Sequence, residues 1–285
     1  MIRTSKSAGA GKRATPEFWQ TGGVLLSLLP LLLGAGCVVQ DPPPEKKELT
    51  PAEAAAKISA ALKEEDVDAA AAVVDELGHR GAKEVVAAVA PALEHKQPVL
   101  RAAALQALRY NPHPGALDAL LRVKKSRHIV EDPEQQAAYF YALGQKGDPK
   151  ALPILTEDSK AAGKKESPVM QARIHALGRI RTQAALEELI SMLAATGGRG
   201  GRNPFWNDLH LSLQVLAGAD HGTEPGDWIL WWNDAKKGFA MAKNPPQLPE
   251  ELAEQWDALW ADPYAEDPLE SALGGLQQGQ GGGKP

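Results

Sequence analysis

The stretch ARIHALGRIRT, residues 172–182, decides the fold of this chain, because its apolar pattern and its ending recur along the sequence. Comparable segments are RAAALQALRYNP at 101–112 and QAAYFYALGQKGD at 136–148. Five leucines near such endings align with separations of 31, 35, 34 and 39 residues: Leu77, Leu108, Leu143, Leu177 and Leu216. Each interval has room for two helices and two turns, so the sequence predicts a stack of helical hairpins.

Helix beginnings are marked by a capping side chain followed by proline. The capping oxygen accepts a hydrogen bond from a free backbone N–H, and proline at the next position lacks only an N–H that the first turn leaves unpaired. Five pairs fit this description: Thr50-Pro51, Asp132-Pro133, Asp148-Pro149, Ser167-Pro168 and Asn203-Pro204. Glu53 and Gln135, three residues after their caps, predict capping boxes at the first two. The chain should therefore contain many short helices.

The composition also favours helices. Apolar residues make up 44% of the chain and aromatic residues only 5%, whereas β-branched and aromatic residues dominate strands. Within 85–93, Val85, Val86, Val89 and Leu93 recur at helical spacing. A single helix cannot bury such a stripe alone, so neighbouring hairpins must supply the core.

The repeated segments resemble HEAT repeats of the short bacterial kind, over about residues 50–222. The resemblance implies an all-α fold, an α-solenoid of about five HEAT-like helical hairpins. Tetratricopeptide repeats fit less well, because the Trp-Leu-Gly-Tyr order of their first helix is missing and the period varies. The segment LAGADHGTEPGDWILWW at 216–232 resembles the closing segment of many bacterial HEAT-repeat proteins. We therefore expect a Trp-rich C-terminal helical cap at 223–262.

Six of the seven tryptophans lie in the last third of the chain. Two predicted helical faces collect most of them, with Trp228, Trp231 and Trp232 on one and Leu252, Trp256, Leu259 and Trp260 on the other. We interpret these rings as the cap that covers the end of the stack, because a terminal repeat would otherwise expose its core. The alternative is an aromatic groove that binds a ligand.

The only cysteine, Cys37, ends an apolar run that follows a basic start. The basic residues are Arg3, Lys6, Lys12 and Arg13, and the run is VLLSLLPLLLGAG at 24–36. This order matches an export signal at 1–36, and the run is too short to span a bilayer comfortably. A single cysteine forms no internal disulfide and no cysteine-based zinc site.

The segment LGAGC at 33–37 resembles the lipobox of bacterial lipoproteins, although Gly34 departs from the usual pattern. The resemblance implies that Cys37 is acylated and becomes the mature N-terminus, a firm membrane anchor. Val38 is not the aspartate that keeps enteric lipoproteins at the inner membrane, so an outer-membrane location in the bacterial cell envelope is favoured. The alternative is a cleaved secretory signal with an incidental cysteine.

The segment after Cys37 carries three consecutive prolines, so residues 37–49 should form an extended tether. Residues 263–285 are rich in glycine and glutamine and should be a disordered tail. Removal of residues 1–36 takes four basic residues and one acid from a chain of net charge −5, which leaves −8. Such an acidic body is a poor nucleic-acid binder.

No pattern of a catalytic, nucleotide-binding or metal site is present. The motifs GxSxG, GxxxxGK[ST] and HExxH are absent, and no two of the seven histidines lie four residues apart. His175 and His221 are therefore interpreted as structural residues. We expect no cofactor and no enzyme activity; the alternative is a HEAT-like lyase or isomerase, or a small-ligand-binding protein.

Basic residues gather in the turns that join the first and second helices of three repeats. These turns emerge along one edge of a stacked solenoid and contribute Lys124, Lys125, Arg127, Lys160, Lys164, Lys165, Arg199 and Arg202. We name this set the basic rim and expect it to contact an anionic partner, namely lipid headgroups, an acidic polysaccharide or an acidic protein. The alternative is that these charges only solvate flexible loops.

The function expected from these features is a protein-binding or scaffolding surface in the cell envelope. A solenoid offers an extended face lined by its second helices, and recognition there needs no catalytic group. Candidates for that face are Arg101, Gln106, Arg109, Gln136, Arg173 and Arg179. The remaining alternative is an architectural part of an envelope-assembly complex.

Overall fold

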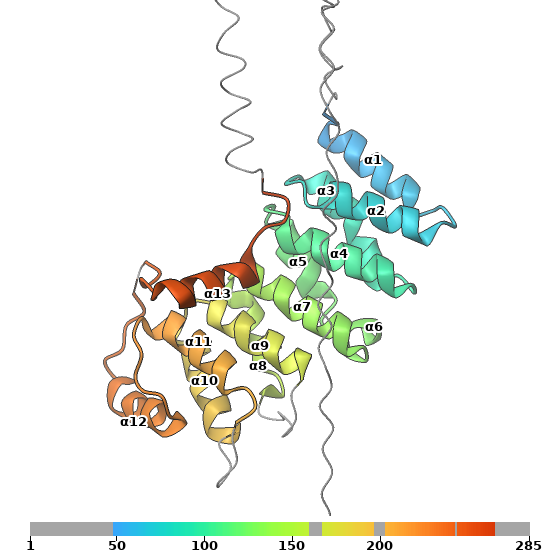
Figure 1. The fold of residues 1–285 in the computed structure, drawn as a ribbon. Helices are drawn as coiled ribbons and strands as arrows, with labels where there is room; N and C mark the ends of the chain where they lie inside the picture. The colour runs from blue at the N-terminus through green and yellow to red at the C-terminus, as the bar shows by residue number, and fades with distance from the viewer. Residues whose placement is uncertain (1–47, 160–166, 197–202, 243, 266–285) are drawn as a thin grey trace, which may run out of the picture. The chain divides into compact units, whose positions relative to one another are not determined.

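The computed structural model describes residues 48–159, 167–196, 203–242 and 244–265. All regular structure within these ranges is helical (Figure 1), which confirms the prediction of an all-α chain. The predicted signal at 1–36, most of the tether and all but the first residues of the tail lie outside the described ranges.

The described helices form five hairpins in chain order, each with a first and a second helix. The first helices are α1 (Pro51–Ala61), α3 (Lys83–Val89) with the 3₁₀ helix η1 (Ala90–Glu94), α5 (Gly115–Arg122), η2 (Pro149–Ala151) with α8 (Leu152–Thr156), and α10 (Gln183–Thr196). The second helices are α2 (Val67–Gly78), α4 (Pro98–Tyr110), α7 (Pro133–Lys146), α9 (Pro168–Arg179) and α11 (Trp206–Ala217). The short α6 (Arg127–Val130) precedes α7, and α12 (Pro225–Ala235) and α13 (Glu250–Trp260) follow α11.

The hairpins stack through their second helices. Contacts run from α2 to α4, from α4 to α7, from α7 to α9 and from α9 to α11. One hydrophobic core extends along the stack and contains the five aligned leucines, Leu77, Leu108, Leu143, Leu177 and Leu216. Each hairpin thus buries its apolar stripe against its neighbours, which is the α-solenoid arrangement that the repeat predicted.

Glycines that follow three of these leucines allow the second helices to approach closely. A Cβ at Gly78 would lie 2.7 Å from Ala107 Cβ, and one at Gly144 would lie 2.7 Å from Ala176 Cα. Native interiors are packed too densely to absorb an added methyl group without a shift. The recurring Leu-Gly pair therefore sets the spacing of the stack.

The predicted helix starts are confirmed in part. Thr50 forms a complete capping box: its Oγ1 accepts from the Glu53 N–H at 3.3 Å, and the Glu53 carboxylate accepts from the Thr50 N–H at 2.8 Å. Asp132 also caps α7, but the predicted box with Gln135 is wrong. Gln135 is buried, and its amide donates to the carbonyl of Pro98 in the preceding repeat at 3.3 Å, because tertiary packing draws it there.

The start predicted at Asn203-Pro204 is also displaced. The Asn203 side chain accepts from the Phe205 N–H at 2.9 Å, which forms a turn, and α11 begins only at Trp206. Short polar side chains commonly bond the backbone two residues ahead in this way. The capping signal therefore marked a turn just before the helix.

Helix α12 covers the end of the stack. Trp228 is fully buried and Trp232 is 6% exposed, and both belong to the main core next to α10. The Trp228 indole N–H donates to the carbonyl of Gly222 at 2.9 Å, which satisfies its polar edge. These two rings act as the expected cap, whereas α13 lies elsewhere.

Candidate functional site

Helix α13 and the residues after it lie on the exposed side of the second helices (Figure 1). We call this side the second-helix face and define it by Asp75, His79, Arg109, Tyr110, Tyr141, Gln145, His175, Gly178, Arg179, Leu211 and Val215. Contacts of the segment run from α11 through α9, α7 and α4, and they end at α2. The sequence placed this segment in the cap, but most of its contacts are with earlier repeats.

An apolar stripe attaches α13 to the face. Trp256 and Trp260 are each 5% exposed, and Leu252 and Leu259 lie beside them. These four side chains, at spacings of four, seven and eight residues, form one side of a helix. They join Leu211 and Val215 of α11 in a hydrophobic cluster that is separate from the main core.

The two tryptophan rings sit over the glycines that bring the second helices together. A Cβ at Gly144 would lie 2.7 Å from Trp260 Cη2, and one at Gly178 would lie 2.9 Å from Trp256 Cη2. The missing side chains leave room for the edge of each indole ring. The same glycines therefore serve both the stacking of the repeats and the seating of α13.

The last carbonyls of α13 are recognised by side chains of the repeats. Arg109 Nη2 donates to the carbonyl of Leu259 at 2.6 Å, and Gln145 Nε2 donates to the carbonyl of Trp260 at 3.2 Å. The final carbonyls of any helix lack partners within the helix and carry partial negative charge. A cation and an amide from α4 and α7 thus supply the C-terminal cap of α13.

Two guanidinium groups also face the ring of Trp260. The Arg109 and Arg179 guanidinium carbons each lie 5.6 Å from its centroid, and Arg109 is 5.3 Å from the Tyr141 ring. Cation–π contacts of this kind stabilise by about 0.5–1 kcal/mol at exposed sites and more when desolvated. These two predicted face residues are therefore in contact with α13.

The chain beyond α13 continues along the face to the first hairpin. The Tyr264 ring stacks on His79, the C-cap residue of α2, at a centroid distance of 3.8 Å and meets Tyr110 edge-on at 5.8 Å. Its hydroxyl donates to the carboxylate of Asp75. Burial, followed by that carboxylate, raises the pKa of Tyr264, so it stays a neutral donor.

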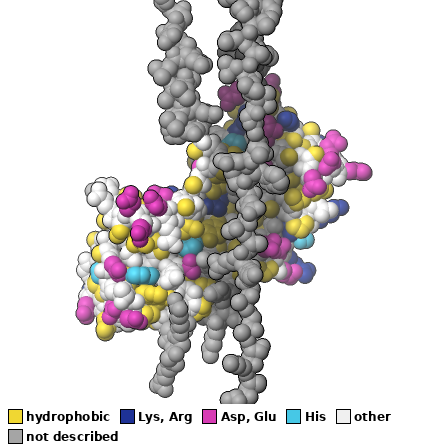
Figure 2. All heavy atoms as spheres, viewed as in Figure 1, with side chains coloured by type: hydrophobic (Ala, Val, Ile, Leu, Met, Phe, Trp, Pro, Cys, Tyr) yellow, Lys and Arg dark blue, Asp and Glu magenta, His cyan; other side chains and the backbone are white. Residues whose placement is uncertain are grey.

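The segment is acidic, and basic side chains of the second helices lie close to it. Residues 248–264 contain five acids and no basic residue, and Figure 2 shows acidic side chains gathered where α13 lies. Lys146 donates to the carbonyl of Asn111 at 2.5 Å, and burial lowers its pKa to about 8, although nearby Asp262 opposes this. Asp257 likewise favours the charged form of Arg179.

Beneath α13, a hydrogen-bonded relay connects three second helices. Tyr141 Oη lies 3.1 Å from His175 Nδ1, and His175 Nε2 lies 3.0 Å from Asp208 Oδ1. Burial opposes ionisation of Asp208, but hydrogen bonds from His175 and Gln171 outweigh it and lower its pKa. The carboxylate also accepts a hydrogen bond from Gln171 Nε2 at 3.0 Å, so polar contacts of Asp208 reach two side chains of α9.

The relay positions side chains and contains no activated nucleophile. Burial raises the pKa of Tyr141, which keeps its hydroxyl protonated. His175 is only 3% exposed, consistent with the structural role expected for it. Sequence reasoning missed the relay. Its members are separated by 34 and 33 residues, close to the repeat period, but the period alone does not show which side chains meet between repeats.

Three of the eight basic-rim residues are described, namely Lys124, Lys125 and Arg127. All three are exposed and line a cavity of about 410 Å³ between α6, α7, α8 and α9. Glu131, Glu157 and Asp158 line the same cavity, and Glu131 pairs with Arg127 at 3.0 Å. The described residues of the basic rim therefore lie among acidic side chains.

The remaining rim residues, Lys160, Lys164, Lys165, Arg199 and Arg202, lie outside the described residues, as does Cys37. Within the described ranges, no helix is long and apolar enough to cross a membrane. Those ranges also contain no group of three or more histidine, cysteine, aspartate or glutamate residues arranged to hold a metal ion.

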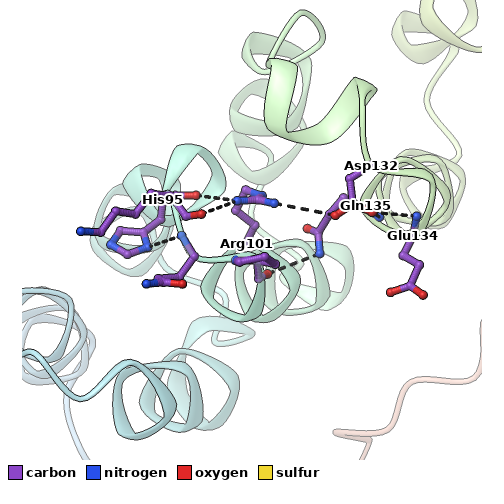
Figure 3. A network of polar contacts seen from close by, with 8 residues as sticks. His95, Arg101, Asp132, Glu134 and Gln135 are labelled. Carbon is purple, nitrogen blue, oxygen red and sulfur yellow. Dashed lines mark hydrogen bonds and ion pairs between the residues drawn. The ribbon is translucent and has the colours of Figure 1, made fainter.

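Arg101, predicted for the binding face, is instead buried at 3% exposure. Its Nη1 donates to the carbonyls of His95 at 2.9 Å and Lys96 at 3.1 Å, and its Nη2 lies 3.9 Å from Asp132 (Figure 3). The guanidinium thus closes the turn between η1 and α4. The surface prediction for Arg101 is wrong, because these carbonyls needed a donor.

Arg173 has the same role in the fourth repeat. It is 7% exposed, donates to the carbonyls of Leu155 and Glu157 at the end of α8, and lies 4.8 Å from the Phe140 ring centroid. Gln136, another predicted face residue, lines the cavity beside the basic rim. Of the six candidates, Arg109 and Arg179 touch α13, and Gln106 is half-buried on α4.

Comparison with protein families supports the repeat architecture. Residues 55–131 match HEAT repeats. The match begins within α1 and ends just after α6, and the later hairpins continue the same stacking. A comparison with curated proteins found no match. The resemblance to HEAT repeats is thus confirmed for the first part of the solenoid.

Proposed function

We propose that this chain is a lipid-anchored, extracytoplasmic protein of the bacterial envelope whose HEAT repeats present the second-helix face to a partner protein. The HEAT-repeat match supports the coarser part, a helical-repeat scaffold for protein interaction. The observation that carries the proposal is α13 itself. Its Trp256 and Trp260 show that this face can bury an amphipathic helix of suitable chemistry.

The proposed location in the cell envelope rests on the sequence alone. A basic start, an apolar run and LGAGC precede Cys37, and Val38 favours the outer membrane over the inner one. Acyl chains on Cys37 would hold the protein at the lipid, and the proline-rich tether would keep the repeats clear of it.

A photo-crosslinking amino acid at position 106 tests the scaffold. Gln106 is half-buried on α4, one helical turn before Arg109 and Tyr110 of the second-helix face, whereas Ala87 on α3 is exposed and serves as the control position. We expect a defined protein adduct from position 106 in the native envelope and none from position 87. Equal adducts from both positions, or none from either, would contradict a binding role of this face.

Replacement of Cys37 by serine tests the anchor. We expect Cys37→Ser to move the protein from the membrane to the soluble envelope fraction, with its helix content unchanged because residue 37 precedes the folded repeats. Mass spectrometry of the parent chain should show acyl groups on residue 37. A variant that stays as firmly bound as the parent would remove the anchor from the proposal.

A second candidate function, small-ligand binding, is favoured by the cavity between α6, α7, α8 and α9. Its volume of about 410 Å³ and its Tyr139 and Phe140 walls suit a small molecule that carries polar groups. Native mass spectrometry of the purified chain checks this candidate. An additional mass bound to the parent chain and absent from the Lys125→Glu variant would support small-ligand binding. A spectrum that shows the chain without any bound mass would count against it.

A further inference from the structure

We infer that α13 is an intramolecular ligand of the second-helix face and that an acidic amphipathic helix of a partner protein replaces it there. This inference rests on the proposed scaffold function and adds the chemistry of the partner and its regulation. Three features carry it, namely the separate core of α13, the kind of contacts it makes, and the charge of the segment.

The contacts of α13 are separable from those that hold the solenoid together. Trp256 and Trp260 form their own cluster with Leu211 and Val215, while the main core runs through the repeats without them. No regular helix connects α12 to α13 among the described residues of 236–249. Release of α13 therefore uncovers the second-helix face but leaves the buried core of the stack closed.

The contacts on α13 are ones that another helix can supply. Large side chains at i, i+4, i+7 and i+8 fill the face, and the C-terminal carbonyls meet Arg109 and Gln145. Recognition of a helix in a groove depends on such spaced anchors. A partner helix that fits would carry aromatic residues four positions apart above Gly144 and Gly178, and would end next to Arg109.

The charges near the second-helix face also restrict which partner helix can bind there. Arg109 and Arg179 of the face, together with the neighbouring Lys146, lie close to a segment with five acids and no basic residue. Complementary charge speeds encounter and disfavours basic competitors. The expected partner helix is therefore acidic as well as amphipathic, and its binding should weaken as salt rises.

Attachment to the same chain makes α13 a strong competitor. A short connection gives a local concentration of about millimolar order, so a free helix of equal affinity binds the parent chain poorly. Loss of the docked state removes this competition and raises the apparent affinity of the face. The full-length chain with α13 undocked should thus be the form that binds best.

The test uses a fluorescent peptide of residues 248–265 and the full-length chain, with fluorescence anisotropy as the readout. Trp256→Ala/Trp260→Ala removes the anchors of the resident α13, and Gln255→Ala, at an exposed and uncharged position of the same helix, is the matched control. We expect the peptide to bind the double variant at least tenfold more tightly than the parent or the control. Arg109→Ala added to the double variant should reverse most of that gain.

A second measurement avoids any change to the anchors. A protease site inserted between Gln247 and Leu248, where Gln247 is exposed, allows α13 to be cut from the folded chain. The cut segment should stay bound and then exchange with added labelled peptide, while circular dichroism shows that the solenoid remains helical. An unexchangeable segment, or no peptide binding to the double variant, would overturn the inference.

The outcomes separate this inference from the scaffold proposal. Equal crosslinking from position 106 in the parent and the double variant would leave the scaffold standing and overturn displacement of α13. A parent chain that forms dimers by exchanging α13 would assign the face to a second copy and overturn the partner helix. Crosslinking that increases in the double variant supports both proposals.

Discussion

At the scale of single residues, two glycines have a double role. Gly144 and Gly178 bring neighbouring second helices together, and each also accepts the edge of an indole ring from α13. A Cβ at either position meets atoms on both sides, and at Gly144 one of these is the backbone Cα of Ala176. Little movement is available there, because the repeats are packed on both sides.

We predict that Gly144→Ala lowers the free energy of unfolding by about 1–3 kcal/mol, the usual result of overpacking. The matched control is Gly226→Ala in α12, where nothing lies within 4 Å of the added Cβ. Because alanine favours helices over glycine by about 1 kcal/mol, that change should be neutral or mildly stabilising. Denaturant titration of the three chains measures the difference, and equal midpoints would contradict the close approach.

Lys146 should make the free energy of unfolding depend on pH. Burial lowers its pKa from the ordinary 10.5 to about 8 in the folded chain. Between these values the unfolded chain holds the proton that the folded chain has lost, so the free energy of unfolding rises with pH. The gain should be of the order of 1 kcal/mol after allowance for partial solvent exposure.

Urea unfolding at pH 7.5 and pH 9.5 measures this rise, and Lys146→Met should lack it. Burial raises the pKa of Tyr139 and Tyr264 in the folded chain, but these groups contribute equally to the parent and to Lys146→Met, so the difference between the two pH slopes reports Lys146. If the free energy of unfolding changes with pH equally in the parent chain and in Lys146→Met, Lys146 is freely solvated in the folded chain.

At the scale of elements, α12 and α13 show how two Trp-rich helices acquire different roles. Both carry aromatic side chains at helical spacing, yet α12 joins the main core beside α10, whereas α13 forms a satellite cluster on the second-helix face. The difference lies in the surfaces they meet. The end of the stack offers an open core, and the second helices offer shallow positions at glycines.

Arg109→Ala should loosen the last turn of α13. It removes the donor to the Leu259 carbonyl and the cation near the Trp260 ring, and a hydrogen bond from a charged group contributes about 1.5–3 kcal/mol. Hydrogen exchange in residues 256–260 should accelerate roughly tenfold or more. The matched control, Arg122→Ala, loses only an exposed contact within its own helix and should leave that exchange unchanged.

At the scale of the whole molecule, the described residues of the basic rim and the acidic segment 248–264 lie on different elements. Lys124 and Lys125 lie at the turn between α5 and α6, while the acids of 248–264 lie along the second helices. The rim residues also share their cavity with Glu131, Glu157 and Asp158, which weakens any attraction to anions.

We predict that the unacylated chain binds anionic vesicles weakly and in a salt-sensitive manner. At about 1 kcal/mol for each basic residue near the surface, Lys124→Ala/Lys125→Ala should reduce binding at most roughly 30-fold. Lys236→Ala/Lys237→Ala, a pair of exposed lysines after α12, is the control and should have little effect. Vesicle sedimentation distinguishes these cases, and salt-insensitive binding would exclude the rim as a contact.

Local patterns along the chain were enough to predict the helical repeat and its phase. The aligned leucines, the apolar stripes and the Thr50 cap depend on spacing within one helix or one hairpin, and each kept its expected place. The Leu-Gly pairs at 77–78, 143–144 and 177–178 also carried a signal for close packing that spacing of apolar residues alone does not reveal.

Other features depended on residues far apart in the chain. Arg109 reaches Leu259 across 150 positions, Tyr264 reaches Asp75 across 189, and the relay at His175 joins three repeats. Arg101 and Arg173 likewise turned inward, because carbonyls at the ends of neighbouring helices needed donors. Periodicity shows that a side is apolar or charged but not which surface will cover it. Only the stacking of the hairpins created the face on which α13 lies.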